Sequence, residues 1–221
     1  MSWIASGLRW VFDFIVGFSN SYGIAIILVT ILIKLVLLPL TVRQAKSMQV
    51  TKEIQPKLTE LQKKYKDNPQ ELQSRTLKLY QEYKYNPLGG CLPLLIQLPI
   101  LWAFFQVLRE LPQSEAAQFF LWNLTQPVNQ QLGEVTVLSL ISVVTLPLLS
   151  MLTQFISIRQ TSVDPSQQGM MMFMPVLIGF LSFTMPAGLV LYWIVQNLFS
   201  IAQQAWIGKR FPTAPQGGQV K

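Results

Sequence analysis

One lysine stands alone in a long apolar stretch, and its chemistry would be that of a cation held away from water. Lys34 is the thirteenth residue of the apolar block 22–42 and its only charged residue. Helix geometry puts roughly 13 Å between Lys34 and Arg43, and a lysine stem covers about half of that distance. A cation facing hydrocarbon costs at least roughly 2.5–3.5 kcal/mol. The options are therefore a deprotonated amine, polar neighbours or a water-filled cavity, and in a water-filled cavity Lys34 is expected to attract anionic groups of a binding partner.

The charge distribution indicates that Lys34 lies in a segment that crosses a membrane. The chain has 221 residues, with 17 Lys and Arg and 10 Asp and Glu, a charged share of 12% that is about half the usual one. Five apolar blocks contain Lys34 as their only charge: 22–42, 90–108, 135–158, 171–185 and 188–207. About 20 residues cross a bilayer as a helix. The sequence therefore predicts an all-α integral membrane protein with five transmembrane helices, and it excludes a soluble single core.

Polar residues in these blocks are candidates for the surroundings of the amine. Thr30 lies one turn before Lys34, Gln97 interrupts the second block, and Gln196 and Asn197 lie in the last. No acidic residue occurs in any block, so none of the blocks supplies a carboxylate. Polar side chains also hold membrane helices together, which is our interpretation of the Ser and Thr residues of the third block. An unpaired charge is not needed for that purpose, so we assign Lys34 a solvated role facing substrate.

The composition excludes several enzyme classes. There is no His and only one Cys, Cys91, so no Ser-His-Asp triad, Cys-His pair or zinc site can form. An intramembrane protease would need an unusual Ser-Lys pair. A phosphate-binding loop is also missing, because Gln203 stands where its first Gly should be before Gly208 and Lys209. We expect neither an enzyme nor a cofactor or metal.

Orientation follows from the basic residues. Residues 43–85 hold ten basic and five acidic residues, whereas 110–134 holds three acidic residues and no basic one. The positive-inside rule places 43–85 and a short basic tail, 208–221, in the cytoplasm and the N-terminus outside. Residues 1–21 are predicted to form an external interfacial segment, in which Trp3 to Phe18 make a helix. The aromatic run 119–122 suggests a second short helix at the same surface.

Residues 43–85 are predicted to form an antiparallel helical hairpin. Apolar residues recur at helical spacing on both sides of Asp67-Asn68-Pro69, where Asn68 suits an N-cap and Pro69 the first helical position. The basic excess either fixes topology at the lipid surface or makes a docking site for a ribosome, for the signal recognition particle or its receptor, or for the Sec translocon. The aromatic pattern of sequence-specific RNA binding is absent.

Three segments carry a resemblance to a known family. Thr30-Ile31-Leu32-Ile33-Lys34 followed by Pro39-Leu40-Thr41 resembles the start of the YidC/Oxa membrane-protein insertase core. The run from Asn86 to Pro99, NPLGGCLPLLIQLP, resembles the signature of the second span. The run from Pro186 to Trp193, PAGLVLYW, resembles that of the last span. The resemblance extends from residue 20 to 207 and is to a compact form without the large periplasmic domain.

The resemblance implies a five-helix core, 22–207, with a hydrophilic groove open to the cytoplasm and to lipid. It implies insertion of short-tailed nascent membrane proteins without nucleotide hydrolysis, alone or beside the Sec channel. By position, Lys34 stands where bacterial relatives usually have a groove arginine, and Thr30, Gln97 and Trp193 stand where relatives line the groove or contact substrate. We expect a bacterial plasma membrane, with the thylakoid as the alternative location. The alternative function is a transporter that binds a small solute or anion at Lys34.

Overall fold

The computed structural model describes residues 2–83, 92–132, 137–161 and 165–210. These parts are mainly helical. The helices are α1 (Ser2–Ser19), α2 (Tyr22–Val36), α3 (Leu38–Lys64), α4 (Pro69–Glu82), α5 (Leu92–Arg109), α6 (Val137–Thr161), α7 (Pro165–Ser182) and α8 (Ala187–Arg210). Between α5 and α6 lie two short 3-10 helices, η2 (Glu115–Ala117) and η3 (Val128–Leu132), and two strands, β1 (Gln118–Phe119) and β2 (Trp122–Asn123).

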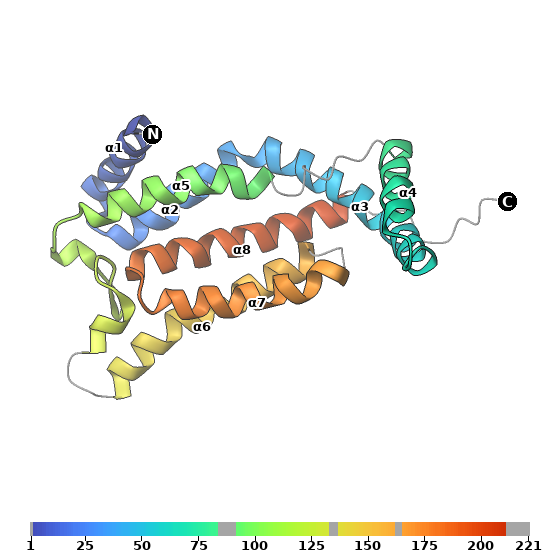
Figure 1. The fold of residues 1–221 in the computed structure, drawn as a ribbon. Helices are drawn as coiled ribbons and strands as arrows, with labels where there is room; N and C mark the ends of the chain where they lie inside the picture. Colours follow the sequence, from blue (N-terminus) through green and yellow to red (C-terminus); the bar gives the residue numbers. More distant parts are fainter. Residues whose placement is uncertain (1, 84–91, 133–136, 162–164, 211–221) are drawn as a thin grey trace.

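Five of the helices lie side by side. Helices α2, α5, α6, α7 and α8 share one direction in space, and α8 runs between the others (Figure 1). Helix α8 packs against α2, α5 and α6, and α6 also packs against α7. The α3–α4 pair projects from one end of this bundle, here called the hairpin end. The segments between α5 and α6 cover the opposite end, here called the loop end.

Apolar side chains cover the outside of the bundle as well as its core. Tyr192 and Phe104 are buried, with ring centroids 4.5 Å apart. Phe173 and Phe180, on the outer side of α7, are 62% and 70% exposed. Exposed apolar side chains on the helices of the bundle fit contact with lipid.

The lengths of the helices differ from the predicted blocks. In the described part of the chain, one helix, Val137–Gln160 within α6, is long and apolar enough to cross a membrane. Tyr22–Val36, Ile96–Arg109 and Phe173–Ser182 are apolar but shorter.

The first predicted block is divided between two helices. Helix α2 ends at Val36, Leu37 stands between the helices, and α3 begins at Leu38 and continues to Lys64. Pro39, at the start of α3, has no backbone N–H to donate, so α2 cannot continue through it as regular helix. Residues 38–42, predicted as the end of the first span, thus belong to the helix that forms the hairpin.

The hairpin itself forms as predicted from its cap and its apolar spacing. Asn68 accepts a hydrogen bond from the backbone N–H of Glu71 at 3.2 Å, and Pro69 is the first residue of α4. Ile54, Leu58 and Leu79 are buried between α3 and α4. Lys57 donates a hydrogen bond to the Tyr83 hydroxyl across the pair, and this bond raises the pKa of Lys57 above its usual value.

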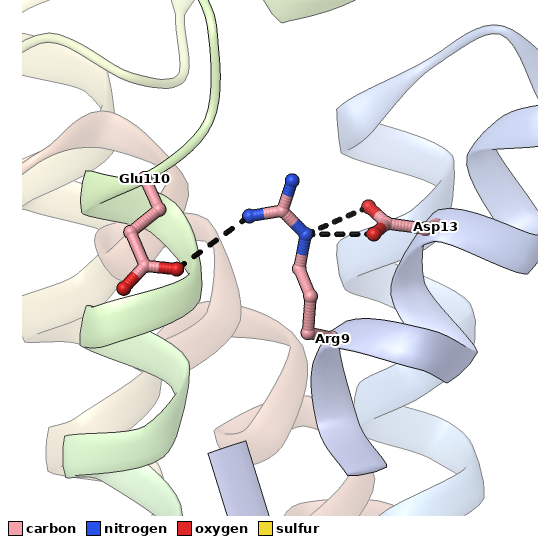
Figure 2. Close-up of polar contacts among 3 residues, drawn as sticks. All are labelled: Arg9, Asp13 and Glu110. Atoms are coloured by element: carbon pink, nitrogen blue, oxygen red, sulfur yellow. Dashed lines mark hydrogen bonds and ion pairs between the residues drawn. The ribbon is translucent and has the colours of Figure 1, made fainter. Parts of the chain in front are cut away.

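Helix α1 lies at the loop end and packs on α2 and α5. Its buried face includes Phe12, whereas Trp10 is 70% exposed. Figure 2 shows Arg9 between two carboxylates: its Nε lies 2.7 Å from Asp13 Oδ2, and its Nη1 lies 3.8 Å from Glu110 Oε2 at the end of α5. The predicted N-terminal helix is therefore present, and an ion pair that spans two helices helps to orient it.

The prediction of a second interfacial helix around residues 119–122 was wrong. Strands β1 and β2 form a small antiparallel hairpin with Phe119 opposite Trp122, and Phe120 at its turn has a φ of 53°. Tertiary contacts fix this shape. The Trp122 indole N–H donates to the Ser142 carbonyl at 2.7 Å, and the Phe119 ring lies where a Cβ on Gly23 would be.

Backbone hydrogen bonds tie the loop end to the start of α8. Val128 N–H donates to the Met185 carbonyl, Ala187 N–H to that of Gln126, and Gly188 N–H to that of Leu124, at 2.9–3.1 Å. Gly188 is required here because a Cβ would lie 2.8 Å from the Leu124 carbonyl oxygen. The short link between α7 and α8 is thus held firmly at this end of the bundle.

Candidate functional site

Polar residues repeat along one face of α8. Tyr192, Gln196, Ser200 and Gln203 are four, four and three residues apart, a spacing that places them on one side of a helix. Each is hydrogen-bonded to another helix or to its neighbour on this face. We call this set and its partners the polar ladder: Tyr192, Gln196, Ser200 and Gln203 of α8 with Gln97, Lys34 and Thr41.

The first contact of the polar ladder joins α5 to α8. The Gln97 side-chain amide donates to the Tyr192 hydroxyl and, at 2.9 Å, to Gln196 Oε1. Gln97 is flanked by apolar residues in α5, so its amide is a polar group in an otherwise apolar contact between two helices. The donor and acceptor groups satisfy one another, as polar groups between membrane helices must.

Lys34 makes the second contact. Its Nζ donates to Ser200 Oγ at 3.1 Å, and Ser200 Oγ in turn donates to the Gln196 backbone carbonyl at 2.9 Å. Ion pairs in the described part of the chain are confined to Arg9 and Arg75 with their carboxylates, so none reaches Lys34. The amine therefore has a neutral partner, and its charge is not neutralised by any described carboxylate.

The third contact lies nearest the hairpin end. The Gln203 side-chain amide donates to Thr41 Oγ1, and Thr41 Oγ1 can donate to the Leu38 carbonyl at 3.0 Å. Thr41 belongs to α3, so this contact links α8 to the helix that forms the hairpin. The polar ladder thus runs from Tyr192, in the first part of α8, to the point where the hairpin leaves the bundle.

Three of the six predicted site residues take other places. Thr30 is 1% exposed, and its hydroxyl donates to the Ile26 carbonyl of its own helix at 2.6 Å. Asn197 is buried on the α6 side of α8, where its amide donates to Thr153 Oγ1 at 3.4 Å. The Thr30 contact satisfies a hydroxyl within α2, and the Asn197 contact connects α8 to α6. Neither contact involves Lys34, Gln97 or Gln196.

Trp193, the sixth predicted residue, lines an apolar pocket of about 470 Å³ between α5 and the start of α8. The other lining residues are all apolar: Leu98, Pro99, Leu101, Trp102, Phe105, Met185 and Leu189. Since α8 turns by about 100° per residue, the adjacent side chains of Tyr192 and Trp193 lie in different surroundings. A polar face and an apolar pocket therefore lie next to each other on the same two helices.

Sequence reasoning missed four members of the polar ladder as site residues: Tyr192, Ser200, Gln203 and Thr41. For the missed residues of α8 the signal was the spacing of polar residues on one face, which connects Tyr192, Gln196, Ser200 and Gln203 by four, four and three residues. The partners could not be identified in the same way because Thr41 and Gln203 are 162 residues apart in sequence.

Comparisons with known proteins agree with this architecture. The sequence profile of the 60Kd inner membrane protein family matches residues 14–214. A protein of Syntrophobacter fumaroxidans named membrane protein insertase YidC is 39% identical over 94% of this chain and 38% of its own length. A protein of that name from Wolinella succinogenes is 37% identical over 100% of this chain and 40% of its own. The chain thus spans about two fifths of the length of these relatives.

A solved structure shows the same arrangement. The crystal structure of an active YidC insertase, with its first transmembrane domain resolved, matches 90% of this chain and 45% of its own, with a TM-score of 0.71 and 30% identity. The family description and the bacterial relatives place the chain in a bacterial inner membrane. The profile match, the relatives and the shared fold confirm the resemblance of the motifs, and the chain belongs to the 60Kd inner membrane protein family, the YidC/Oxa family.

Proposed function

We propose that the chain is a membrane protein insertase that moves short hydrophilic flanks of nascent membrane proteins across the bilayer and releases their hydrophobic helices into lipid. The observation that carries this proposal is the polar ladder, which brings an amine without a described carboxylate partner to one face of a helix in an apolar bundle. Family membership and the relatives named as insertases support the same function.

In this proposal the polar ladder lines a wet groove that opens at the hairpin end. The groove gives the polar flank of a substrate hydrogen-bonding partners in place of hydrocarbon, where unpaired polar groups are costly. The Lys34 ammonium attracts acidic residues of that flank and exchanges its Ser200 partner for a carboxylate. The pair with a carboxylate adds the attraction between two opposite charges, which the bond to the neutral Ser200 hydroxyl lacks.

The energy for transfer comes from the substrate itself and requires no nucleotide hydrolysis. Burying the substrate helix in lipid contributes about 25 cal/mol for each Å² of apolar area removed from water. The membrane potential can add about 2.3 kcal/mol per elementary charge for each 100 mV. The apolar pocket at Trp193 lies beside the polar ladder, so a substrate helix can contact the pocket while its flank contacts the polar groups.

We further propose that α2, α5, α6, α7 and α8 are the five spans, with the loop end outside and the hairpin end in the cytoplasm. The basic excess of residues 43–85 supports this orientation. Helix α1 would then lie at the outer surface of the bilayer with Trp3, Trp10, Phe14 and Phe18 toward lipid, since all four are exposed. The hairpin would meet the ribosome, a targeting factor or the Sec channel.

Reconstitution tests the proposed function directly. The purified chain is placed in liposomes, a single-span substrate with a short acidic flank is synthesised in their presence, and protection of the flank from added protease is measured. We expect protection well above that in empty liposomes, with no dependence on added ATP once the substrate has been made and released. Protection equal to the empty-liposome background would contradict the function, and solute flux without protection would favour a transporter.

A further inference from the structure

Two contacts of the polar ladder lie on either side of the α2–α3 junction. Lys34 precedes Leu37 by three residues and Thr41 follows it by four, about one helical turn each way. Their partners on α8, Ser200 and Gln203, are likewise one turn apart. The two hydrogen bonds therefore hold both sides of the junction against the same face of one continuous helix.

The junction has the features of a hinge. Leu37 is its single linking residue, and Pro39 prevents one regular helix from passing through it. After the junction, α3 is one helix of 27 residues, and α4 packs against its far part. A force on the hairpin is therefore carried by a long lever to Leu37, and the Thr41 contact lies four residues from that link.

We propose that Ser200 and Gln203 are positioning residues that clamp this hinge to α8, and that the clamp must open at Gln203 before Lys34 can leave Ser200 for a substrate. The proposal rests on the proposed function of Lys34 as the group that meets the substrate flank. It adds a means by which a partner bound to the hairpin controls access to Lys34. At the loop end, by contrast, backbone hydrogen bonds hold the segments together, so opening occurs at the hairpin end.

Spin-label distances test the clamp without reference to insertion. Labels are placed on exposed Gln73 of α4 and exposed Lys209 of α8, with Cys91→Ser removing the native thiol, and the distance distribution is measured in liposomes. Thr41→Val removes the hydroxyl and keeps the shape, so we expect a clearly broader distribution. Thr41→Ser keeps the hydroxyl and should retain the original width. Gln203→Ala should broaden it as well, whereas Gln204→Ala, the matched change at the next residue, should not.

Reversible cross-linking tests whether the clamp must open. With Thr41→Cys and Gln203→Cys, a short bifunctional thiosulfonate reagent should reduce insertion at least tenfold, and a reductant should restore it. A control pair at the loop end, Asn129→Cys with Thr184→Cys, should insert equally well with and without the cross-link. Equal distance distributions for Thr41→Val and Thr41→Ser would overturn the clamp, as would full insertion by the cross-linked 41–203 pair. The spin-label distances are measured without substrate. They therefore test the clamp separately from the proposed insertion activity.

Discussion

At the scale of single residues, the site depends on a lysine whose hydrogen-bond partner is a hydroxyl. We predict that Lys34→Met lowers insertion of substrates with acidic flanks by roughly tenfold, because a hydrogen bond to a charged group contributes about 1.5–3 kcal/mol. Lys34→Arg should keep most of the activity, since the positive charge remains, although its planar group pairs with carboxylates differently. The measurement is the ratio of protected acidic-flank to neutral-flank substrate. Lys209→Met, which removes an exposed charge from the same chain, is the control, and an unchanged ratio in Lys34→Met would refute the charge role.

Two glycines of α8 provide a second prediction at this scale. A methyl group on Gly188 would lie 2.8 Å from the Leu124 backbone oxygen, and that oxygen cannot move away easily because Gly188 N–H is hydrogen-bonded to it. Gly188→Ala should therefore destabilise the fold by about 1–3 kcal/mol. A Cβ on Gly208 meets no neighbouring atom within 4 Å, so Gly208→Ala should leave stability equal or raise it by up to about 1 kcal/mol. In thermal unfolding measured in detergent, the midpoint temperature should fall for Gly188→Ala and not for Gly208→Ala.

At the scale of the elements, the hairpin has a small core of its own. Leu79 is 8% exposed and packs with Ile54 and Leu58, whereas Leu77 on the same helix is 54% exposed. We predict that Leu79→Ala destabilises the α3–α4 pairing by about 2 kcal/mol, near the lower end for a buried leucine. Leu77→Ala should change it by less than about 0.5 kcal/mol. Hydrogen exchange of α4 amides measures both, and similar exchange in the two variants would show that the pairing does not depend on this core.

The same elements show what could be predicted from the sequence. The end of α3 and the start of α4 were predictable because Asn68 and Pro69 act through local geometry. The turn at Phe120 was not, since phenylalanine rarely adopts a positive φ, and packing of Phe119 against Gly23 determines it. Lys34 and Gln97 were found from their chemical type in apolar blocks. Gln196 was found in the same way, but the pairing was not, because only the packing of α2 and α5 on α8 brings Lys34 to Ser200 and Gln97 to Tyr192 and Gln196.

At the scale of the whole molecule, the two ends of the bundle are held by different kinds of bond. Backbone hydrogen bonds connect the loop end, where Gly188 N–H reaches Leu124 and Ala187 N–H reaches Gln126. Side-chain hydrogen bonds of Ser200 and Gln203 connect the hairpin end. Backbone hydrogen bonds restrain both segments that they connect. A single side-chain hydrogen bond contributes only about 0.5–1.5 kcal/mol and can be exchanged for another. This asymmetry fits the proposed function, in which the loop end stays closed and substrate enters at the hairpin end.

We predict that the hairpin end lies in the cytoplasm and the loop end outside, since the asymmetry between the ends has its proposed meaning only in that orientation. Ser74 on the hairpin and Gln130 at the loop end are both exposed and lie at opposite ends of the bundle. With Cys91→Ser as background, a membrane-impermeant maleimide added to intact spheroplasts should label Gln130→Cys and leave Ser74→Cys unlabelled. Inverted vesicles should give the reverse pattern, and detergent should make both thiols reactive. The reason is the net charge of +5 on residues 43–85, which favours retention in the cytoplasm. Labelling of Ser74→Cys in intact spheroplasts would contradict the proposed orientation, in which the hairpin end faces the cytoplasm.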